Sequence, residues 1–293
     1  MKNLFPRKKP FPVPKIQVTP EYMAKGRLKE SYSSTKSAFD VPWMGVVAMA
    51  FAKYPHFYNT LWKYMYLLSK SNEFNNLCKK LVNISKRKAI ELKPKSIIKK
   101  LKKIGYDEYE IKKINEVNKI FTIGNMPYLT MATIARILLE KGELLNRSSY
   151  KKNKHNKKSN NQKHLLLLEQ HHADDSLKEV YKSIKSNLGL PFINTDYRAF
   201  ARWPSYFIIS WKYFLPTLLS QEYEKKVLEI HNFIIKESLL LPNPNKLTSI
   251  QIITAAKRDK KLNEIKKVVN LFQWLLPGLV TNVAFMREQI KIK

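Results

Sequence analysis

The stretch "LKEVYKSIKSNLGLPFINTDYRAFARWPSYFIISWKYF", residues 177–214, decides the fold because the chain contains it twice. Its counterpart, "LKESYSSTKSAFDVPWMGVVAMAFAKYPHFYNTLWKYM", lies 149 residues earlier at residues 28–65. Extended without a gap to residues 74 and 223, the match holds 17 identities among 47 pairs. A second match, offset by 150 residues, pairs "IFTIGNMPYLTMATIAR" with "NLFQWLLPGLVTNVAFM". The sequence therefore predicts an internal duplication with repeats of more than a hundred residues.

The residue pattern inside both repeats predicts helices. Apolar residues recur at spacings of three and four, and strand-like alternation is rare; the periodic segments are residues 46–68, 129–140, 195–215, 223–241 and 264–286. Prolines at corresponding places of the two repeats are expected to start or break these helices; they are Pro42, Pro55, Pro127, Pro191, Pro204 and Pro277. We therefore predict an all-α fold of two related helical repeats packed about a pseudo-two-fold axis.

Composition marks two segments outside the repeats. The N-terminal residues 1–25 are basic and rich in proline, which predicts an extended arm. Residues 146–165 form a Lys/Asn/Ser run with no hydrophobic period, which predicts a disordered linker of low complexity. The expected domains are thus the arm, a first helical repeat at residues 26–145, the linker, and a second repeat at residues 166–293.

The charge balance limits the classes of partner without choosing one. Lys and Arg number 54 against 23 Asp and Glu, and the net charge of +31 attracts nucleic acid, acidic protein or other anionic ligands through a basic surface. The single cysteine excludes a disulfide framework and a cysteine zinc cluster. No run reaches the roughly 18 apolar residues of a membrane span. The basic N-terminus leaves the compartment open between cytoplasmic and mitochondrial.

One position shows where the two repeats differ chemically. Asn194, Thr195 and Asp196 align with an apolar Gly-Val-Val segment, residues 45–47. An ionised carboxylate buried there costs several kcal/mol unless it is hydrogen-bonded or used in a reaction. The segment therefore indicates a functional site. The alternative is a helix N-cap, because Asn, Thr and Asp are favoured at helix starts and Pro191 lies just upstream.

The segments "LKEVYKSIKSNLGLPFINTDYRAFARWPSYFIISWKYFLP" and "GNMPYLTMATIARILLE" resemble the group I 2-haloacid dehalogenases, all-helical enzymes that act on both stereoisomers. The resemblance covers most of the chain outside the arm and the linker. It implies a hydrolase without cofactor or metal, with a site between two related helical halves. It also implies the reaction: an Asp-activated water attacks C2 of a small 2-haloalkanoic acid directly, inverting C2 without a covalent ester.

The resemblance assigns two catalytic residues. Asp196 matches the aspartate that takes the proton from water, and an sp3 carbon–halogen centre needs such a base because water is a poor nucleophile. Asn125 matches the asparagine of the "GN-P" segment, whose amide holds the same water. The alternative for Asn125 is a turn residue following Gly124.

The resemblance also suggests how the substrate is bound. Backbone N–H groups at the helix entry of Asn194 and Thr195 suit the substrate carboxylate. Trp43 lies where the family places an aromatic residue beside the halide, although an indole after a proline is equally typical of a core. Val46 stands where an aromatic residue is expected, so the halide pocket, and with it the identity of the substrate, differs from the pattern.

The sequence also suggests a metal site and a non-catalytic role. His171 and His172 beside Asp174 and Asp175 suggest a metal, but no third ligand is spaced to join them, and either aspartate suits an N-cap for the helix from Leu177. The second hypothesis for the whole chain is a non-catalytic dehalogenase-like scaffold, an RNA-binding or protein-binding subunit of an organellar assembly.

Overall fold

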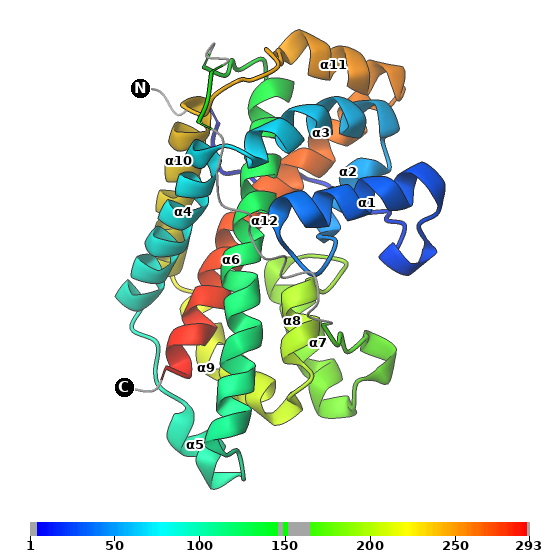
Figure 1. Cartoon of the computed structure of the whole chain (residues 1–293). Coiled ribbons are helices and arrows are strands. Elements are labelled where there is room, and N and C mark those ends of the chain that lie inside the picture. The colour runs from blue at the N-terminus through cyan, green and yellow to red at the C-terminus, as the bar shows by residue number, and fades with distance from the viewer. Residues whose placement is uncertain (1–4, 146–148, 152–164, 292–293) are drawn as a thin grey trace. The chain divides into compact units, whose positions relative to one another are not determined.

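A computed structural model describes residues 5–145, 149–151 and 165–291 (Figure 1). Over these residues the regular structure is helical and no β-strand is present, so the predicted all-α class is confirmed. The predicted linker, residues 146–165, lies outside the described residues apart from 149–151 and 165, and stays a prediction. The same holds for residues 1–4 of the predicted arm.

The α-helices range from 6 to 32 residues in length. The α-helices are α1 (Gly26–Phe39), α2 (Val46–Ala52), α3 (Pro55–Ser69), α4 (Asn72–Glu91), α5 (Ile98–Lys103), α6 (Glu108–Leu139), α7 (Asp175–Leu188), α8 (Thr195–Phe200), α9 (Pro204–Leu218), α10 (Gln221–Leu239), α11 (Ser249–Arg258) and α12 (Leu262–Gln289). Two 3-10 helices, η1 (Glu21–Met23) and η3 (Gln170–His172), precede α1 and α7.

The prolines act in two ways. Pro55 and Pro204 occupy the first position of α3 and α9, as predicted, because the missing N–H has no partner there in any helix. Pro127 and Pro277 instead lie inside the continuous helices α6 and α12, so the prediction that they start or break helices is wrong for these two. Proline in a helix interior costs about 3 kcal/mol. The surrounding turns are almost entirely buried, and this packing outweighs the lost hydrogen bond.

Packing divides the chain into two compact units. Unit 1 comprises Met1–Leu81, Gly124–Lys163 and Ile230–Pro277, and unit 2 comprises Val82–Ile123, His164–Glu229 and Gly278–Lys293. These units follow contacts, whereas the predicted repeats follow sequence, and each unit takes segments from both repeats. The division into repeats therefore stays a prediction.

Each unit has an aromatic core. In unit 1, α3 packs against α11, α1 and α2 (Figure 1), and the ring of Phe39 meets Trp62 and Tyr128 edge-on at 5.4 and 5.3 Å. In unit 2, α9 packs against α7 and α8, and Tyr197 meets Trp211 edge-on at 6.0 Å. Edge-to-face pairs of this kind stabilise a core beyond the area that they bury.

Several hydrogen bonds recur at positions 149 residues apart, which supports the predicted duplication. The pairs are Trp62 Nε1 to Ser34 Oγ with Trp211 Nε1 to Ser183 Oγ, Tyr32 Oη to the Thr19 carbonyl with Tyr181 Oη to the Leu168 carbonyl, and the Phe74 amide to Ser71 Oγ with the Tyr223 amide to Ser220 Oγ. The same side chains thus fix the same turns in both halves.

Helix α12 is long and apolar enough to cross a membrane by length and composition alone. Its most apolar window, however, is 89% buried inside the protein. Such burial is typical of a core helix, so this helix gives only weak support for a membrane span.

Candidate active site

The start of α8 carries three buried polar residues. Asn194 holds the N-cap position with extended backbone angles (φ −61°, ψ 150°), and Thr195 and Asp196 are the first two helical residues. Their exposed fractions are 5%, 5% and 2%. Asp196 is therefore not the cap, and the Asn194 side chain makes no capping hydrogen bond. The alternative of a helix N-cap is therefore confirmed for the position of Asn194, although its side chain makes no capping hydrogen bond, and it does not account for Asp196.

Asn194 has a further unusual feature. Its Oδ1 atom is buried and has no hydrogen-bond partner in the described part of the chain. Buried amide oxygens are nearly always paired, because leaving one unpaired costs about 1–3 kcal/mol. The fold therefore does not use this oxygen, although it buries it.

A chain of polar side chains fixes the helix that carries Asp196. The hydroxyl of Tyr197 accepts a hydrogen bond from Asn282 Nδ2 at 2.7 Å, and Asn282 Oδ1 accepts one from the Tyr223 hydroxyl at 2.6 Å. Burial raises the pKa of Tyr197, so its hydroxyl stays protonated. This network was not among the features predicted from the sequence. The signal was present, since Tyr197 and Asn282 align with alanines at residues 48 and 132 of the first repeat.

Arg198 anchors the other side of α8. Its Nη1 atom donates to Glu169 Oε1 at 2.6 Å, and its carbonyl accepts from the Leu168 amide at 2.9 Å. The arginine side chain is 19% exposed. These contacts attach the segment before η3 to α8, which is a structural role.

In unit 1, Tyr128 ties the segment before α2 to α6. Its hydroxyl donates to the Trp43 carbonyl at 2.8 Å and accepts from the Gly45 amide at 2.9 Å. A Cβ atom on Gly45 would lie 2.8 Å from the Tyr128 ring, so glycine permits this close approach. Burial raises the pKa of Tyr128, which keeps the bridging hydroxyl protonated.

The same unit holds the other predicted site residues. A Cβ atom on Gly124 would lie 2.4 Å from the Trp43 ring, so the indole packs directly on the backbone of α6. Asn125 follows in the interior of that helix and is 3% exposed, so the alternative of a turn residue is wrong. Val46 is the first residue of α2 and is half-buried.

The structure thus presents the predicted residues as two groups. Asn194, Thr195 and Asp196 share the start of α8 in unit 2, while the segment of Trp43 and Val46 is held to the helix of Asn125 in unit 1. A carboxylate can accept a proton, amides can orient water or a carboxylate, and an indole offers an apolar wall with one donor. The individual roles stay predictions.

The histidine-rich segment has a simple explanation. Asp174 is the N-cap of α7 and accepts a hydrogen bond from the Leu177 amide at 2.8 Å, which confirms the predicted cap. Within residues 5–145, 149–151 and 165–291, no group of three or more His, Cys, Asp or Glu side chains is arranged to hold a metal ion.

The comparisons with known proteins agree with one another. An (R)-2-haloacid dehalogenase of Rhizobium sp. (strain NHG3) is 35% identical over 245 residues, covering 83% of this chain and 94% of that protein. An (R)-2-haloacid dehalogenase of Pseudomonas putida is 31% identical over 282 residues, covering 94% and 92%. No family profile matches the chain.

Solved structures show the same likeness. A complex of D-2-haloacid dehalogenase with L-LA superposes with a TM-score of 0.88 at 29% identity, covering 97% of this chain and 99% of that one. A mutant of a D-2-haloacid dehalogenase in complex with D-2-CPA superposes with a TM-score of 0.86 at 29% identity and the same coverage.

Proposed function

Because this chain belongs to the 2-haloacid dehalogenase family, it is a hydrolase acting on carbon–halide bonds, and we propose that it acts by direct displacement at C2 of a small 2-haloalkanoic acid. The water oxygen forms a bond to C2 as the carbon–halogen bond breaks. The halide leaves with the electron pair, one water proton passes to a carboxylate, and C2 inverts. No covalent ester forms.

Asp196 is the proposed base. The observation that carries this proposal is a carboxylate 2% exposed in the first turn of a helix fixed by Tyr197 and Asn282. Burying a carboxylate is unfavourable for folding, so its presence at a place where the other repeat is apolar supports a chemical use. A positioned base of this kind accelerates proton transfer about 10²- to 10⁴-fold.

Asn194 and Thr195 are the proposed carboxylate-binding residues. The first backbone N–H groups of a helix lack intrahelical partners and carry partial positive charge, which suits an anion. The unpaired Oδ1 atom of Asn194 can accept a hydrogen bond from a water molecule, while the substrate carboxylate requires N–H donors.

The resemblance supports the remaining assignments. Asn125 holds the attacking water through its amide, and Trp43 offers an apolar wall and an indole N–H to the halide. Val46 replaces the expected aromatic residue with a smaller side chain, which gives the halide side more room. A wider pocket favours bromo substituents or a longer alkyl chain over chloroacetate.

The names of the relatives suggest a stereochemical preference. The matched proteins are named for (R)- or D-2-haloacids, whereas the resemblance seen in the sequence implied action on both stereoisomers. We therefore propose that this chain prefers the (R) enantiomer and releases an (S)-2-hydroxy acid.

The test is halide release from (R)- and from (S)-2-chloropropionate, with chiral chromatography of the lactate. A single turnover in ¹⁸O-labelled water distinguishes the mechanisms, since direct attack puts label into the first lactate formed. An ester on the enzyme would deliver unlabelled lactate in that turnover and contradict the direct displacement. Retention at C2 would also contradict the direct displacement, because a single attack by water inverts that carbon. Equal rates with both enantiomers would contradict the enantiomer preference alone.

A further inference from the structure

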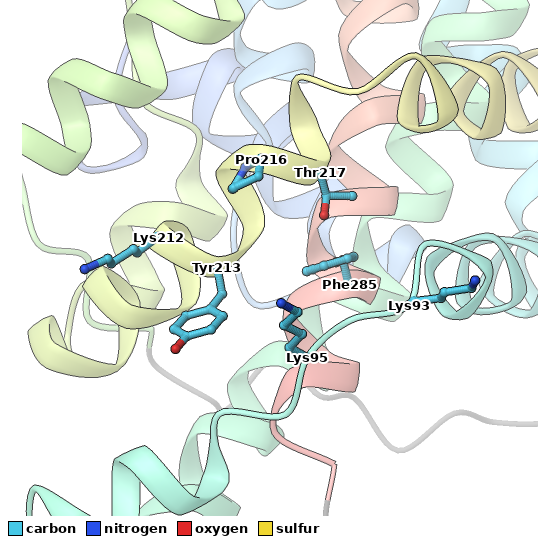
Figure 2. A pocket seen from close by; sticks show the side chains of 7 residues that line it. All are labelled: Lys93, Lys95, Lys212, Tyr213, Pro216, Thr217 and Phe285. Carbon is cyan, nitrogen blue, oxygen red and sulfur yellow. The ribbon is translucent and has the colours of Figure 1, made fainter.

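Unit 2 contains an open cavity of about 310 Å³ that the proposed reaction does not use. Figure 2 shows its lining, which comes from the loop between α4 and α5, from α9 and from α12: Lys93, Lys95, Lys212, Tyr213, Pro216, Thr217 and Phe285. The lining contains no Asp or Glu among the described residues. Its volume lies at the lower end of small-molecule pockets.

The loop that carries two of these lysines has a defined backbone. Lys93 adopts a left-handed conformation (φ 54°), and its amide donates to the Ile90 carbonyl at 2.9 Å. Pro94 has a fixed φ angle because of its ring. Ile97 is fully buried, and its amide donates to the Gln289 carbonyl at 3.0 Å, so α12 anchors the loop. The lysines are therefore presented by fixed backbone positions.

The side chains give the cavity a strongly positive rim and an apolar floor. In Figure 2, Lys95 points toward the space between Tyr213 and Phe285, while Lys93 and Lys212 point outward. The ammonium of Lys100 lies 5.3 Å from the centre of the Tyr213 ring. This ammonium lowers the pKa of the Tyr213 hydroxyl, and Lys212 and Lys95 act in the same direction.

The matching place of the first repeat is packed differently. Tyr64, the counterpart of Tyr213, is fully buried and donates to the Pro242 carbonyl at 3.0 Å, in the loop that follows α10. Two leucines stand there in place of Pro216 and Thr217. The lining of the cavity is therefore not a shared feature of the two repeats, because the matching helix α3 buries its tyrosine and has leucines in place of the proline and the threonine.

Helix α9 contributes a backbone carbonyl, a hydrogen-bond acceptor, beside the lysine donors. A proline inside a helix removes the hydrogen bond to the carbonyl four residues earlier. Pro216 therefore leaves the carbonyl of Lys212 without its usual helix partner. Thr217 and Tyr213 add hydroxyl groups to the lining.

We propose that this cavity binds a small phosphate monoester that carries a planar ring. A phosphate monoester holds close to two negative charges at neutral pH, so the inward-pointing ammonium of Lys95, with the positive charge of Lys93 and Lys212 around the opening, favours it over a monoanionic carboxylate. Lysines bind phosphate as point charges. The half-buried ring of Tyr213 suits a planar ring, because aromatic rings pair favourably with one another, while Phe285 is 1% exposed and closes the floor of the cavity. The proposal is independent of dehalogenation.

The test is isothermal titration calorimetry of the full chain with four probes: adenosine monophosphate, adenosine, inorganic phosphate and a single-stranded RNA oligonucleotide. We expect the monophosphate to bind at least about tenfold more tightly than adenosine or inorganic phosphate, a difference of ~1.4 kcal/mol. The double variant Lys95→Ala/Lys212→Ala should bind adenosine monophosphate about tenfold more weakly or worse. The single variant Lys95→Gln should show part of this loss.

The matched control is the pair Lys119→Ala/Lys182→Ala, which removes the same charge from exposed lysines outside the lining. Halide release should persist in every variant and serve as the test of folding. Equal weakening by the control pair would overturn the proposal, since net charge would then explain binding. Absence of monophosphate binding, binding of RNA alone, or equal affinity for inorganic phosphate would also overturn it.

Discussion

The starts of α2 and α8 share their backbone geometry and differ in their surroundings. Gly45 precedes α2 with φ −64° and ψ 140°, and Asn194 precedes α8 with φ −61° and ψ 150°. A proline lies three residues before each of them. The next two residues are valines in the first case, and Thr195 and Asp196 in the second.

The residues that pack on the two starts also differ as a set. In the first half, the ring of Tyr128 fills the space beside Gly45, and its hydroxyl binds the backbone there. The residue that corresponds to Tyr128 in the second half is Gly278, and the residue that corresponds to Gly45 is Asn194. A small and a large side chain have exchanged places, and the backbone has kept its form. One helix start is thus closed by a tyrosine, while the other presents an amide and a carboxylate.

The largest effect is expected from Asp196→Asn. If Asp196 is the base, the change removes the proton acceptor and keeps the shape, so the turnover number should fall about 10²- to 10⁴-fold. The melting temperature should stay the same or rise, because a buried charge disappears. Halide release under saturating substrate and a thermal melt measure the two quantities.

Asp175→Asn is the matched control for that change. Its carboxylate is 99% exposed and pairs with Lys178 at the start of α7. Activity should therefore stay within a factor of about two of the wild type, because the carboxylate is exposed to solvent and its ion pair with Lys178 contributes little to the fold. A loss in the control as large as that in Asp196→Asn would remove the distinction between the two helix starts.

A second place where the halves differ in polarity predicts a pH effect. His231 lies 149 residues after Val82. Its Nε2 donates to the Phe5 carbonyl at 2.8 Å, which leaves Nδ1 to accept from Gln273 at 3.0 Å. Burial lowers the pKa of His231 to about 4. In the unfolded chain, this histidine takes up a proton below about pH 6.5. In the folded protein, it takes up the proton only near pH 4.

The contribution of His231 to the free energy of unfolding should consequently be constant above about pH 6.5. It should fall by up to about 3 kcal/mol as the pH drops to 4. The comparison is with His231→Gln, which keeps a neutral donor and acceptor and cannot take the proton. Urea unfolding of both proteins between pH 4 and pH 7 isolates the histidine from the carboxylates. A constant difference between the two proteins across this range would contradict the prediction.

Gly45→Ala tests whether the tyrosine closes the first helix start. The added Cβ would lie 2.8 Å from the Tyr128 ring, and overpacking of this kind costs about 1–3 kcal/mol. The double variant Gly45→Ala/Tyr128→Leu should recover part of the loss, because the ring that blocks the methyl group is gone. Strictly additive free energies of unfolding would show that the ring does not occupy this space.

Local signals were predictable from the sequence, whereas long-range pairings were not. Pro55 and Pro204 start helices and Asp174 caps one because backbone geometry within a few residues decides these features. Pro127 lies inside α6 because burial of the surrounding turns outweighs the cost of proline in a helix. This burial depends on contacts with distant parts of the chain, which a rule based on neighbouring residues does not include.

The supports of the candidate site depend on contacts far apart in the chain. Tyr128 meets Gly45 across 83 residues, and Asn282 meets Tyr197 across 85. No spacing rule links such positions. Comparison of the two repeats could have indicated them, because each stands where the other repeat has a residue of different size or polarity.

The smallest effect is expected from Asn194→Gly, which gives the second helix start the residue of the first. Glycine at an N-cap costs only a few tenths of a kcal/mol relative to asparagine, and this asparagine makes no capping bond, so stability should hardly change. If the amide binds substrate, kcat/KM should fall about 2- to 10-fold, which corresponds to the loss of one hydrogen bond. Most of this change should appear as a higher KM. Asn187→Ala removes an exposed amide that bonds to Ser183 and should leave both constants unchanged. A loss of more than ~2 kcal/mol of stability in Asn194→Gly with unchanged KM would mark the amide as part of the fold, because a residue with a folding role loses stability and one with a binding role loses affinity.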